Sequence, residues 1–222
     1  MLMYESALKE METRVKVLSD EFHVLHKYNP IEHIKTRIKS PESICKKLAK
    51  KGYEVNSKNL IEQLDDIAGI RIICSFIPDI YNIVSMIENS PDINVLCKKD
   101  YIASPKESGY SSYHLIVSVP VNFSSGTVDV KVEIQIRTMA MDFWASLEHK
   151  IKYKYSSVVP EGISTELKEC SKMINVLDRR MSLLGSNLIE ELEQDLAQNK
   201  DIIDNSTIEK TLISSSSCMI MK

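Results

Sequence analysis

The sequence predicts an α+β fold in which a mixed β-sheet is flanked by helices, with a long helix near each end of the chain. Three patterns carry this prediction. Residues 128–137 alternate strictly between apolar and polar types, residues 67–76 form an apolar run rich in β-branched side chains, and two long segments repeat apolar residues every three or four positions. Alternation is typical of a strand with two unlike faces, the apolar run indicates a central strand, and the repeats predict amphipathic helices.

The N-terminal part of the chain is expected to be helical. Apolar residues recur from Tyr4 to Leu25 at spacings of four and three, and an Asn-Pro pair at 29–30 ends this pattern. After a basic stretch, a Ser-Pro pair at 40–41 is a typical start for a second helix, which a glycine at position 52 closes. A short third helix is expected at 61–64.

The middle of the chain alternates expected strands with helices. The apolar strand at 67–76 is followed by a helix at 80–87, a short strand at 93–97 and a strand at 114–119. Pro120 is expected to stop this last strand, because proline cannot donate to a sheet ladder. Alternation of this kind predicts one α/β or α+β core.

The C-terminal part begins at Thr138, a candidate N-cap for a helix that runs to about residue 155. A second apolar repeat, from Leu167 to Leu188, could pack on the first helix, on a second copy of the chain, or on both. The sequence then fades into a serine-rich end that we expect to be disordered. We therefore predict an N-terminal helix at 1–28, a core at 29–158, a C-terminal helical region at 159–198 and a disordered tail at 199–222.

Composition narrows the class of protein. The net charge of −3 gives no global basic field for non-specific nucleic-acid binding, so a small anionic substrate fits better than a duplex. The five cysteines are widely spaced, without a CxxC pair, which argues against structural zinc and disulfides. No segment approaches the roughly 18 uninterrupted apolar residues of a membrane span. We expect a cytoplasmic protein without a membrane partner.

The polar face of the alternating strand is the first candidate site. It aligns acids, an amide and cations on one side of the sheet, in the order Asp129, Lys131, Glu133, Gln135 and Arg137. Such groups can hold a metal, a base edge and a phosphate, whereas an ordinary exposed strand face carries mostly Thr, Ser and Lys. The face therefore indicates phosphoryl chemistry.

A basic segment before and within the second helix is the next candidate. Arg37 and Lys39 precede the helix, and Ser43 and Lys47 lie four positions apart on one face of its first turns. A triphosphate could meet cations, a hydroxyl and free backbone N–H groups there. The alternative is a solvated basic helix, since further lysines surround these residues.

Two carboxylates are candidate metal ligands. Asp66 precedes the central strand and Glu133 lies in the alternating strand, so the two acids could hold Mg²⁺ against the phosphates of a nucleotide. Asp66 could instead be a turn residue, and Glu133 could form a salt bridge with Lys131 or Arg137. Arg71, inside the central strand, needs a carboxylate, a phosphate or an aromatic face as partner.

The loop before the strand at 114–119 carries the last candidates. Tyr110 could stack on a purine while Lys106 meets a phosphate, although loop tyrosines also cover core edges. His114 could be a site residue or a structural histidine. His149 shares a helix face with Asp142, which is a weak signal.

These segments resemble the RelA/SpoT-type alarmone synthetase domain, and the short chain resembles the stand-alone small alarmone synthetases of the RelQ kind. The matching stretches span roughly residues 30 to 155 and read RIKSPESICKK, DDIAGIRI, KDYIASPKESGYSSYHL and VEIQIRTMAMDFWASLEHKIKYKY. The resemblance implies a nucleotidyltransferase-like synthetase fold and transfer of the β,γ-pyrophosphate of ATP to the 3′-hydroxyl of GDP or GTP. It implies synthesis without degradation, because no hydrolase region is present.

The resemblance also implies roles for the donor-site residues. Arg37 and Arg71 would sandwich the adenine of ATP. Lys39, Ser43 and Lys47 would contact the ATP phosphates.

The same resemblance assigns the metal and acceptor sites. Asp66 and Glu133 would bind Mg²⁺, and Glu133 would accept the proton of the 3′-hydroxyl. Tyr110 would stack on guanine and Lys106 would contact the acceptor's phosphates. The remaining acceptor-site residues would be His114, Gln135 and Asp142.

The resemblance also has implications for assembly and regulation. The family pattern implies a homotetramer whose central cleft binds the pentaphosphate product (p)ppGpp, with basic residues of the first helix as ligands; here Lys9, Arg14 and Lys16 lie beside two glutamates. Ser111 stands where the family often has Arg or Gln, which affects the choice between GDP and GTP. Two rival functions are a guanine-nucleotide or single-stranded RNA binder without turnover, and a nucleotidyltransferase that releases pyrophosphate.

Overall fold

The computed structural model describes residues 1–25, 28–155 and 159–187. The described residues fall into two units, 1–182 and the helical residues 183–187. The four-part division predicted from the sequence stays a prediction, and its tail at 199–222 lies outside the described residues. No helix of the described part is long and apolar enough to cross a membrane.

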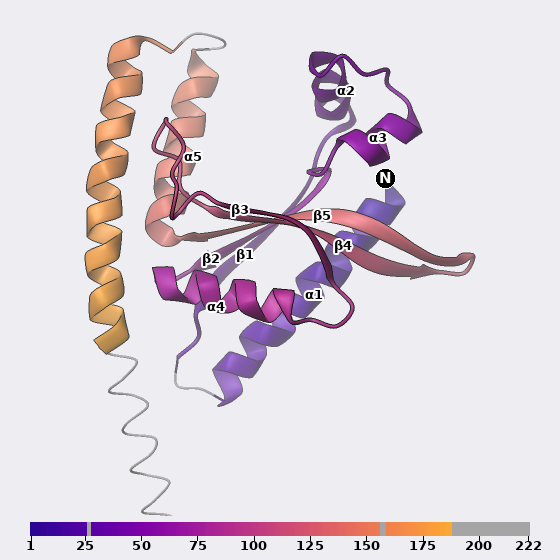
Figure 1. Ribbon diagram of the computed structural model, residues 1–222, viewed down its shortest axis with the longest axis horizontal. Helices are drawn as coiled ribbons and strands as arrows, with labels where there is room; N and C mark the ends of the chain where they lie inside the picture. The colour runs from indigo at the N-terminus through magenta and orange to yellow at the C-terminus, as the bar shows by residue number, and fades with distance from the viewer. Residues whose placement is uncertain (26–27, 156–158, 188–222) are drawn as a thin grey trace, which may run out of the picture. The chain divides into compact units, whose positions relative to one another are not determined.

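The described elements combine a mixed sheet with helices (Figure 1), as the sequence predicted. They are α1 (Leu2–Leu25), β1 (Ile31–Ile38), α2 (Pro41–Lys50), α3 (Ser57–Gln63), β2 (Ala68–Cys74), α4 (Ile77–Glu88), β3 (Asn94–Asp100), β4 (Tyr113–Phe123), β5 (Gly126–Thr138), α5 (Met139–Lys154) and a C-terminal helix at 161–187. The strand order is β1-β2-β5-β4-β3, with β2 and β5 parallel and the other pairs antiparallel. The parallel pair lies in the middle of the sheet, where helices cover the apolar face and side chains of the polar face line a cavity.

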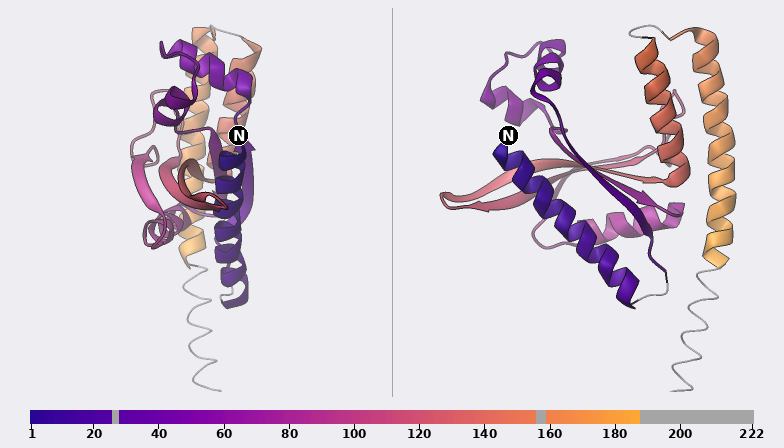
Figure 2. Two further views of the ribbon diagram at one scale, coloured as in Figure 1. Left: turned by 90° about the vertical axis from the view of Figure 1, so that its right-hand side faces the viewer. Right: turned by 180° about the vertical axis from the view of Figure 1, so that it is seen from behind.

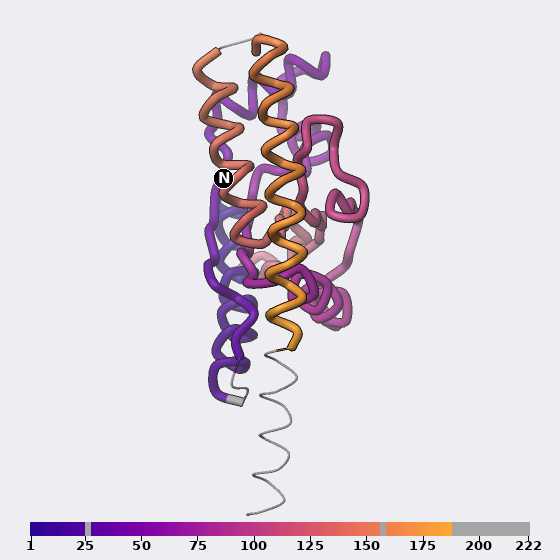
Figure 3. The backbone as a smooth tube through the Cα atoms, turned by 90° about the vertical axis from the view of Figure 1, so that its left-hand side faces the viewer, coloured from indigo at the N-terminus to yellow at the C-terminus, as the bar shows by residue number. Residues whose placement is uncertain are grey.

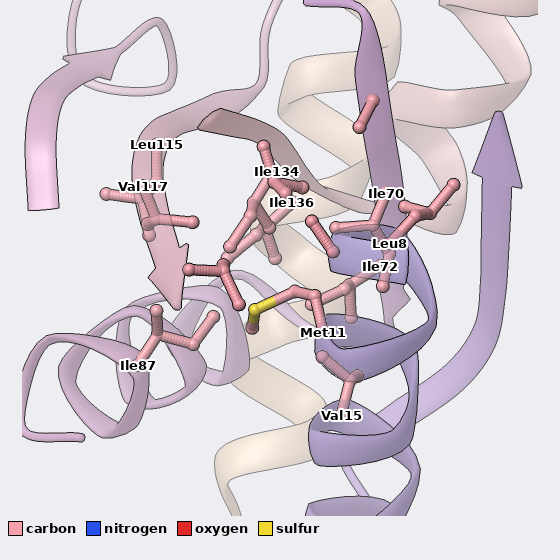
Figure 4. Close-up of a cluster of buried hydrophobic side chains, with 14 of the residues drawn as sticks. Leu8, Met11, Val15, Ile70, Ile72, Ile87, Leu115, Val117, Ile134 and Ile136 are labelled. Carbon is pink, nitrogen blue, oxygen red and sulfur yellow. The ribbon is translucent and has the colours of Figure 1, made fainter. Parts of the chain in front are cut away.

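The apolar face of the sheet forms the core together with α1 and α4 (Figures 1 and 2). In Figure 4, Met11 of α1 points between the strands and α4, toward Ile134 of β5 and Ile87 of α4. Met11, Ile87 and Ile134 are at most 1 % exposed. Burial of this kind stabilises by about 25 cal/mol per Å² of apolar surface, so the core fixes which side of β5 faces inward.

Two strands differ from the sequence-based expectation. Residues 31–38, for which the sequence predicted no strand, form the edge strand β1, most of whose side chains are exposed. Pro120 does not stop β4, which continues to Phe123. The ladder between β3 and β4 ends at Ser118, so β4 has only β5 beside it at Pro120, and the missing N–H is tolerated.

The two long apolar repeats have different surroundings. The repeat in α1 is buried against the chain's own sheet, with Met11 and Val15 at most 1 % exposed. The C-terminal helix lies beside α5 in Figures 1 and 3, and Trp144 of α5 donates a hydrogen bond to the carbonyl of Leu167. Its buried residues are polar, including Ser171 and Asp178.

The apolar side of the C-terminal helix is exposed. Met173, Val176, Leu177 and Met181 are each about half exposed or more. The chain's own sheet thus covers the α1 repeat at Met11 and Val15, whereas the apolar stripe of the C-terminal helix is open to solvent.

Candidate functional site

The polar face of the sheet lies opposite α1 and α4 and is built from two rows of side chains. The first row crosses all five strands in the order Lys35, Arg71, Gln135, His114 and Lys99. Side chains at such facing positions are about 5 Å apart at Cβ, so a row of this composition can meet one ligand along its length.

The second row lies two residues along each strand. Arg37 of β1 faces Gly69 of β2, which in turn faces Glu133 of β5. A Cβ at Gly69 would approach only two backbone oxygens, at 3.8 and 3.9 Å, so the space above this glycine is open. This row therefore places the cation of Arg37 and the acid of Glu133 on either side of Gly69, which has no side chain.

Two cavities adjoin this face, and Asp66 and Glu133 line both of them. The first has a volume of about 380 Å³ and is lined by Lys35, Thr36, Arg37, Asp66, Gly69, Ile70, Arg71, Glu133, Gln135 and Arg137. The second has a volume of about 390 Å³ and is lined by Lys47, Lys51, Asp65, Asp66, Leu96, Cys97, Lys99, Ile116, Lys131 and Glu133. Both volumes are in the range of small-ligand sites. The two carboxylates therefore lie between two cavities that are otherwise rich in cations.

Asp66 combines a paired oxygen with an unpaired one. Its Oδ2 atom accepts from the ammonium of Lys39 and, at 2.6 Å, from that of Lys47, while its buried Oδ1 has no hydrogen-bond partner among the described residues. Burial raises the pKa of Asp66, but the two lysines outweigh burial and hold it below its ordinary value. Asp66 is therefore ionised near neutral pH, with one oxygen free for a cation.

Glu133 is held through both oxygens. Gln135 Nε2 donates to Oε2 at 3.0 Å, and His114 Nδ1 lies 3.5 Å from Oε1. Burial raises the pKa of Glu133, but the interaction with His114 and the hydrogen bond from Gln135 outweigh burial and lower it. Lys131 pairs with Asp65 instead, so the alternative of a salt bridge between Glu133 and Lys131 is not what the structure contains.

The donor-site candidates on α2 lie beside this acid pair. Ser40 caps the helix by accepting from the N–H of Ser43, and Lys47, one turn after Ser43, reaches Asp66. Lys47 thus lines the second cavity, and the alternative of a merely solvated basic helix does not describe it. Ser43 remains exposed near the helix start, where backbone N–H groups favour anions.

The acceptor-loop candidates gather at the other end of the first row. The hydroxyl of Tyr110 lies 2.8 Å from His114 Nε2, and the ammonium of Lys106 lies 4.8 Å from the centre of the Tyr110 ring. Gly109 has a φ of +92°, and a Cβ there would lie 2.0 Å from the hydroxyl oxygen of Ser171. The loop therefore needs glycine both for its conformation and for its contact with the C-terminal helix.

Asp142, at the start of α5, neutralises three cations. Its carboxylate pairs with Arg71 at 3.0 Å, with Lys35 at 3.2 Å and with Arg137 at 3.2 Å. Burial raises the pKa of Asp142, but these cations outweigh burial and lower it. Arg71 thus has the carboxylate partner that its place in a central strand requires.

Two residues of this site were not indicated by the sequence: Lys35 and Lys99, which end the first row. Arg137 was placed on the polar face by the strand alternation, with Glu133 as a possible partner. The structure instead buries Arg137 between Tyr110 and Asp142. His149 is exposed and lines neither of the two cavities.

The two carboxylates could hold a divalent metal ion such as Mg²⁺. Among the described residues, no cluster of three or more His, Cys, Asp or Glu is placed to hold a metal ion. Mg²⁺ does not require one, because it commonly takes one or two carboxylates and completes its shell with phosphate oxygens and water. Asp66, with its unpaired buried oxygen, and Glu133 could supply these carboxylates.

Comparison with protein families identifies one match over more than half of the chain. Residues 36–158 match the model described as the region found in RelA / SpoT proteins. This range contains every residue of the polar face and of the two cavities described above except Lys35.

Curated relatives and solved structures agree with this match. The GTP pyrophosphokinases YwaC and YjbM of Bacillus subtilis are 50 % identical over 181 residues and 40 % identical over 187 residues; the alignments cover 82 % and 84 % of this chain and 86 % and 87 % of the relatives. Small alarmone synthetase 1 of B. subtilis bound to its product pppGpp superposes with a TM-score of 0.77 at 39 % identity, covering 83 % of this chain and 93 % of that one. Small alarmone synthetase 2 gives 0.77 at 47 % identity, covering 84 % and 96 %.

Proposed function

Because this chain belongs to the RelA/SpoT family and is a small alarmone synthetase, we propose that it transfers the β,γ-pyrophosphate of ATP to the 3′-hydroxyl of GDP or GTP. The products are AMP and a guanosine tetra- or pentaphosphate. One observation carries the proposal: Asp66 and Glu133 lie between two nucleotide-sized cavities whose other walls are rich in cations.

The proposed ATP site is formed by Arg37, Arg71 and the two lysines that hold Asp66. The guanidinium planes of Arg37 and Arg71 line the first cavity and can stack on adenine. Lys39 and Lys47 already lie beside Asp66, so they are in place to meet the ATP phosphates. Ser43 adds a hydroxyl near the start of α2.

The proposed GDP or GTP site is formed by the loop that carries Lys106 and Tyr110 and by the adjoining part of the first row. Tyr110 offers a ring for guanine and Lys106 a cation for the acceptor's phosphates. His114 is hydrogen-bonded to Tyr110, and Arg137 links Tyr110 to Gln135 and Asp142, so these three residues lie beside the proposed guanine position. The acceptor's 3′-oxygen attacks the β-phosphorus of ATP, the bond between the α,β-bridging oxygen and that phosphorus breaks, and AMP leaves. Glu133, ionised and pointing into both cavities, accepts the 3′-hydroxyl proton.

We propose Mg²⁺ as the cofactor, held by Asp66 and Glu133. When bound, it would neutralise charge on the pyrophosphate as it is transferred.

The test is incubation of the purified chain with ATP, GDP and Mg²⁺, followed by anion-exchange chromatography. AMP and guanosine tetraphosphate in equal amounts support the proposal. Release of pyrophosphate would indicate a nucleotidyltransferase, and guanine-nucleotide or RNA binding without turnover would indicate the binding function. A parallel reaction with GTP measures the acceptor preference.

We further propose that the chain assembles as a homotetramer through the C-terminal helix, in the cytoplasm. The exposed apolar residues Met173, Val176, Leu177 and Met181 form a stripe that no other part of the described chain covers. Small alarmone synthetase 1 of B. subtilis was crystallised with its product pppGpp. We therefore propose that the assembly of this chain also binds the product.

Light scattering tests the assembly. The wild type should exceed the 25.3 kDa mass of one chain, and a Leu177→Lys, Met181→Lys double variant should dissociate while remaining folded. A wild-type mass near that of one chain would refute the tetramer, and an unchanged oligomer in the variant would place the interface elsewhere.

A further inference from the structure

Arg137 is the common origin of two paths of polar contacts on the polar face. Its side chain is 4 % exposed and is anchored by Asp142, 3.2 Å from Nη1, and by the hydroxyl of Ser112, 3.3 Å from Nε. The remaining nitrogen, Nη2, donates at 2.5 Å to the hydroxyl of Tyr110 and at 3.1 Å to Oε1 of Gln135. The guanidinium therefore holds two side chains of the acceptor site at once.

Both paths end on Glu133. The shorter path runs through Gln135, whose Nε2 donates to Glu133 Oε2 at 3.0 Å. The longer path runs from the Tyr110 hydroxyl to His114 Nε2 at 2.8 Å, and from His114 Nδ1 to Glu133 Oε1 at 3.5 Å. Each oxygen of the Glu133 carboxylate thus faces one path, and both paths begin at the same nitrogen of Arg137.

The direction of hydrogen bonding along the longer path follows from its two ends. A guanidinium can only donate and an ionised carboxylate can only accept. With one proton on the His114 ring, the path is continuous when the Tyr110 hydroxyl accepts from Arg137 and donates to His114 Nε2, so that the histidine proton lies on Nδ1, facing Glu133. A proton on Nε2 instead would leave the tyrosine oxygen with two donors and its own proton unused.

We propose that Arg137 is a positioning residue that sets the orientation of the Glu133 carboxylate through Tyr110 and Gln135. This inference rests on the proposed function and deepens it. Tyr110 has two separable roles: its ring stacks on the guanine of the acceptor, and its hydroxyl carries the path to Glu133. Docking of the acceptor and alignment of the base that receives its proton therefore depend on one side chain.

The first test separates ring from hydroxyl with Tyr110→Phe. The variant keeps the stacking surface but breaks the longer path, so kcat should fall about 10- to 100-fold, as for other groups that orient a site carboxylate. The KM for GDP should stay within about threefold of wild type because the ring remains. An unchanged kcat, or a loss confined to KM, would overturn the proposal.

Tyr101→Phe is the matched control. The Tyr101 ring contacts both Tyr110 and His114 edge-on, but its hydroxyl makes no hydrogen bond within the described residues. Removal of this hydroxyl should leave kcat unchanged. A loss equal to that of Tyr110→Phe would mean that any change in this ring cluster lowers the rate, and would overturn the assignment to the hydroxyl.

The second test is a double-mutant cycle with Arg137→Lys. Lysine keeps the positive charge, but it lacks the planar guanidinium that donates to both Tyr110 and Gln135. If Arg137 acts through the Tyr110 hydroxyl, adding Tyr110→Phe to the Arg137→Lys background should lower kcat by less than about threefold further. Independent, multiplicative effects would overturn the proposal. If Arg137→Lys does not fold by circular dichroism, the result for Tyr110→Phe decides alone.

The outcomes distinguish this inference from the proposed function. A wild type that makes no AMP and guanosine tetraphosphate overturns both. An active wild type with a fully active Tyr110→Phe variant overturns only the positioning role.

Discussion

The two faces of β5 divide stability from chemistry along one strand. Val132, Ile134 and Ile136 are fully buried against the helical side, while Glu133 and Gln135, the residues between them, line the first cavity. Because side chains alternate strictly along a strand, a slip of one residue would exchange the faces and destroy both properties together. The core therefore does more than stabilise the sheet: it fixes the register that places Glu133 between the cavities.

The largest expected effect is on the polar face. Glu133→Gln keeps the volume of the side chain but removes the charge that accepts a proton, so kcat should fall by about 10²- to 10⁴-fold. The free energy of unfolding should change by less than about 1 kcal/mol, because the hydrogen-bonding shape is largely kept. Steady-state kinetics and urea unfolding measure the two quantities.

Asp129→Asn is the control for Glu133→Gln. Asp129 lies on the same face of β5 but is exposed and lines neither cavity, so its loss should leave kcat unchanged. Near wild-type turnover by the purified Glu133→Gln protein would remove Glu133 from the catalytic role.

The second prediction reverses the pattern on the apolar face. Ile134→Ala deletes three carbons from a side chain with 0 % exposure and should lower the free energy of unfolding by about 2 to 5 kcal/mol. The kcat of the folded fraction should remain near wild type. Val128→Ala is the control at the 40 % exposed end of the same face, where the cost should stay below about 1 kcal/mol. A folded Ile134→Ala protein with lost activity would show that the two faces are not separable.

A smaller effect is expected at the rim of the polar face. Tyr110→Ala removes the ring proposed for guanine stacking, worth roughly 1 to 3 kcal/mol, so the KM for GDP should rise about 5- to 150-fold. The KM for ATP should change much less, because the donor residues lie on β1, β2 and α2. Equal increases in both constants, measured by varying each nucleotide in turn, would instead make Tyr110 a structural residue.

Much of this arrangement could be predicted because local patterns encode it. The alternation at 128–137 predicted both faces of β5, and the apolar run at 67–76 predicted β2. The edge strand β1 was missed because its sequence, IEHIKTRI, is polar on the side that faces ligand and water, and it lacks the apolar signal of a central strand.

Burial of the helical repeats could not be predicted from periodicity. The repeats of α1 and of the C-terminal helix look alike in sequence, yet Met11 and Val15 are buried while Leu177 and Met181 are 58 % and 49 % exposed. A repeat shows that a helix has an apolar stripe, but the remaining tertiary structure decides whether the chain itself covers it.

The site was predictable in its members more than in its connections. The motifs pointed to Asp66, Glu133 and Tyr110, but the contacts that hold them join residues far apart in sequence. Arg137 is the clearest case: its partner Tyr110 lies 27 positions away, and no spacing rule relates the two.

The smallest predicted effect concerns a polar residue that is buried without belonging to the site. Asp178 of the C-terminal helix is 5 % exposed and accepts from the hydroxyl of Thr138 at 2.6 Å; burial raises its pKa above the ordinary value. The folded state therefore holds this proton more tightly than the unfolded chain, whose aspartates titrate near about pH 3.9. As pH rises through the window between the unfolded and folded pKa values, ionisation costs the folded state stability.

Asp178→Asn should remove that pH dependence. The amide oxygen can still accept from Thr138, and the variant has no proton to lose, so its stability relative to wild type should increase as pH rises from about 4 to about 7. Urea unfolding at several pH values measures the difference, with Asp129→Asn as the control for losing one negative charge at the surface. Activity should not change with Asp178→Asn, because Thr138 and Asp178 line neither cavity of the polar face. A stability difference that does not change with pH across this range would contradict the prediction. It would mean that burial does not penalise the charged form of the Asp178 carboxylate.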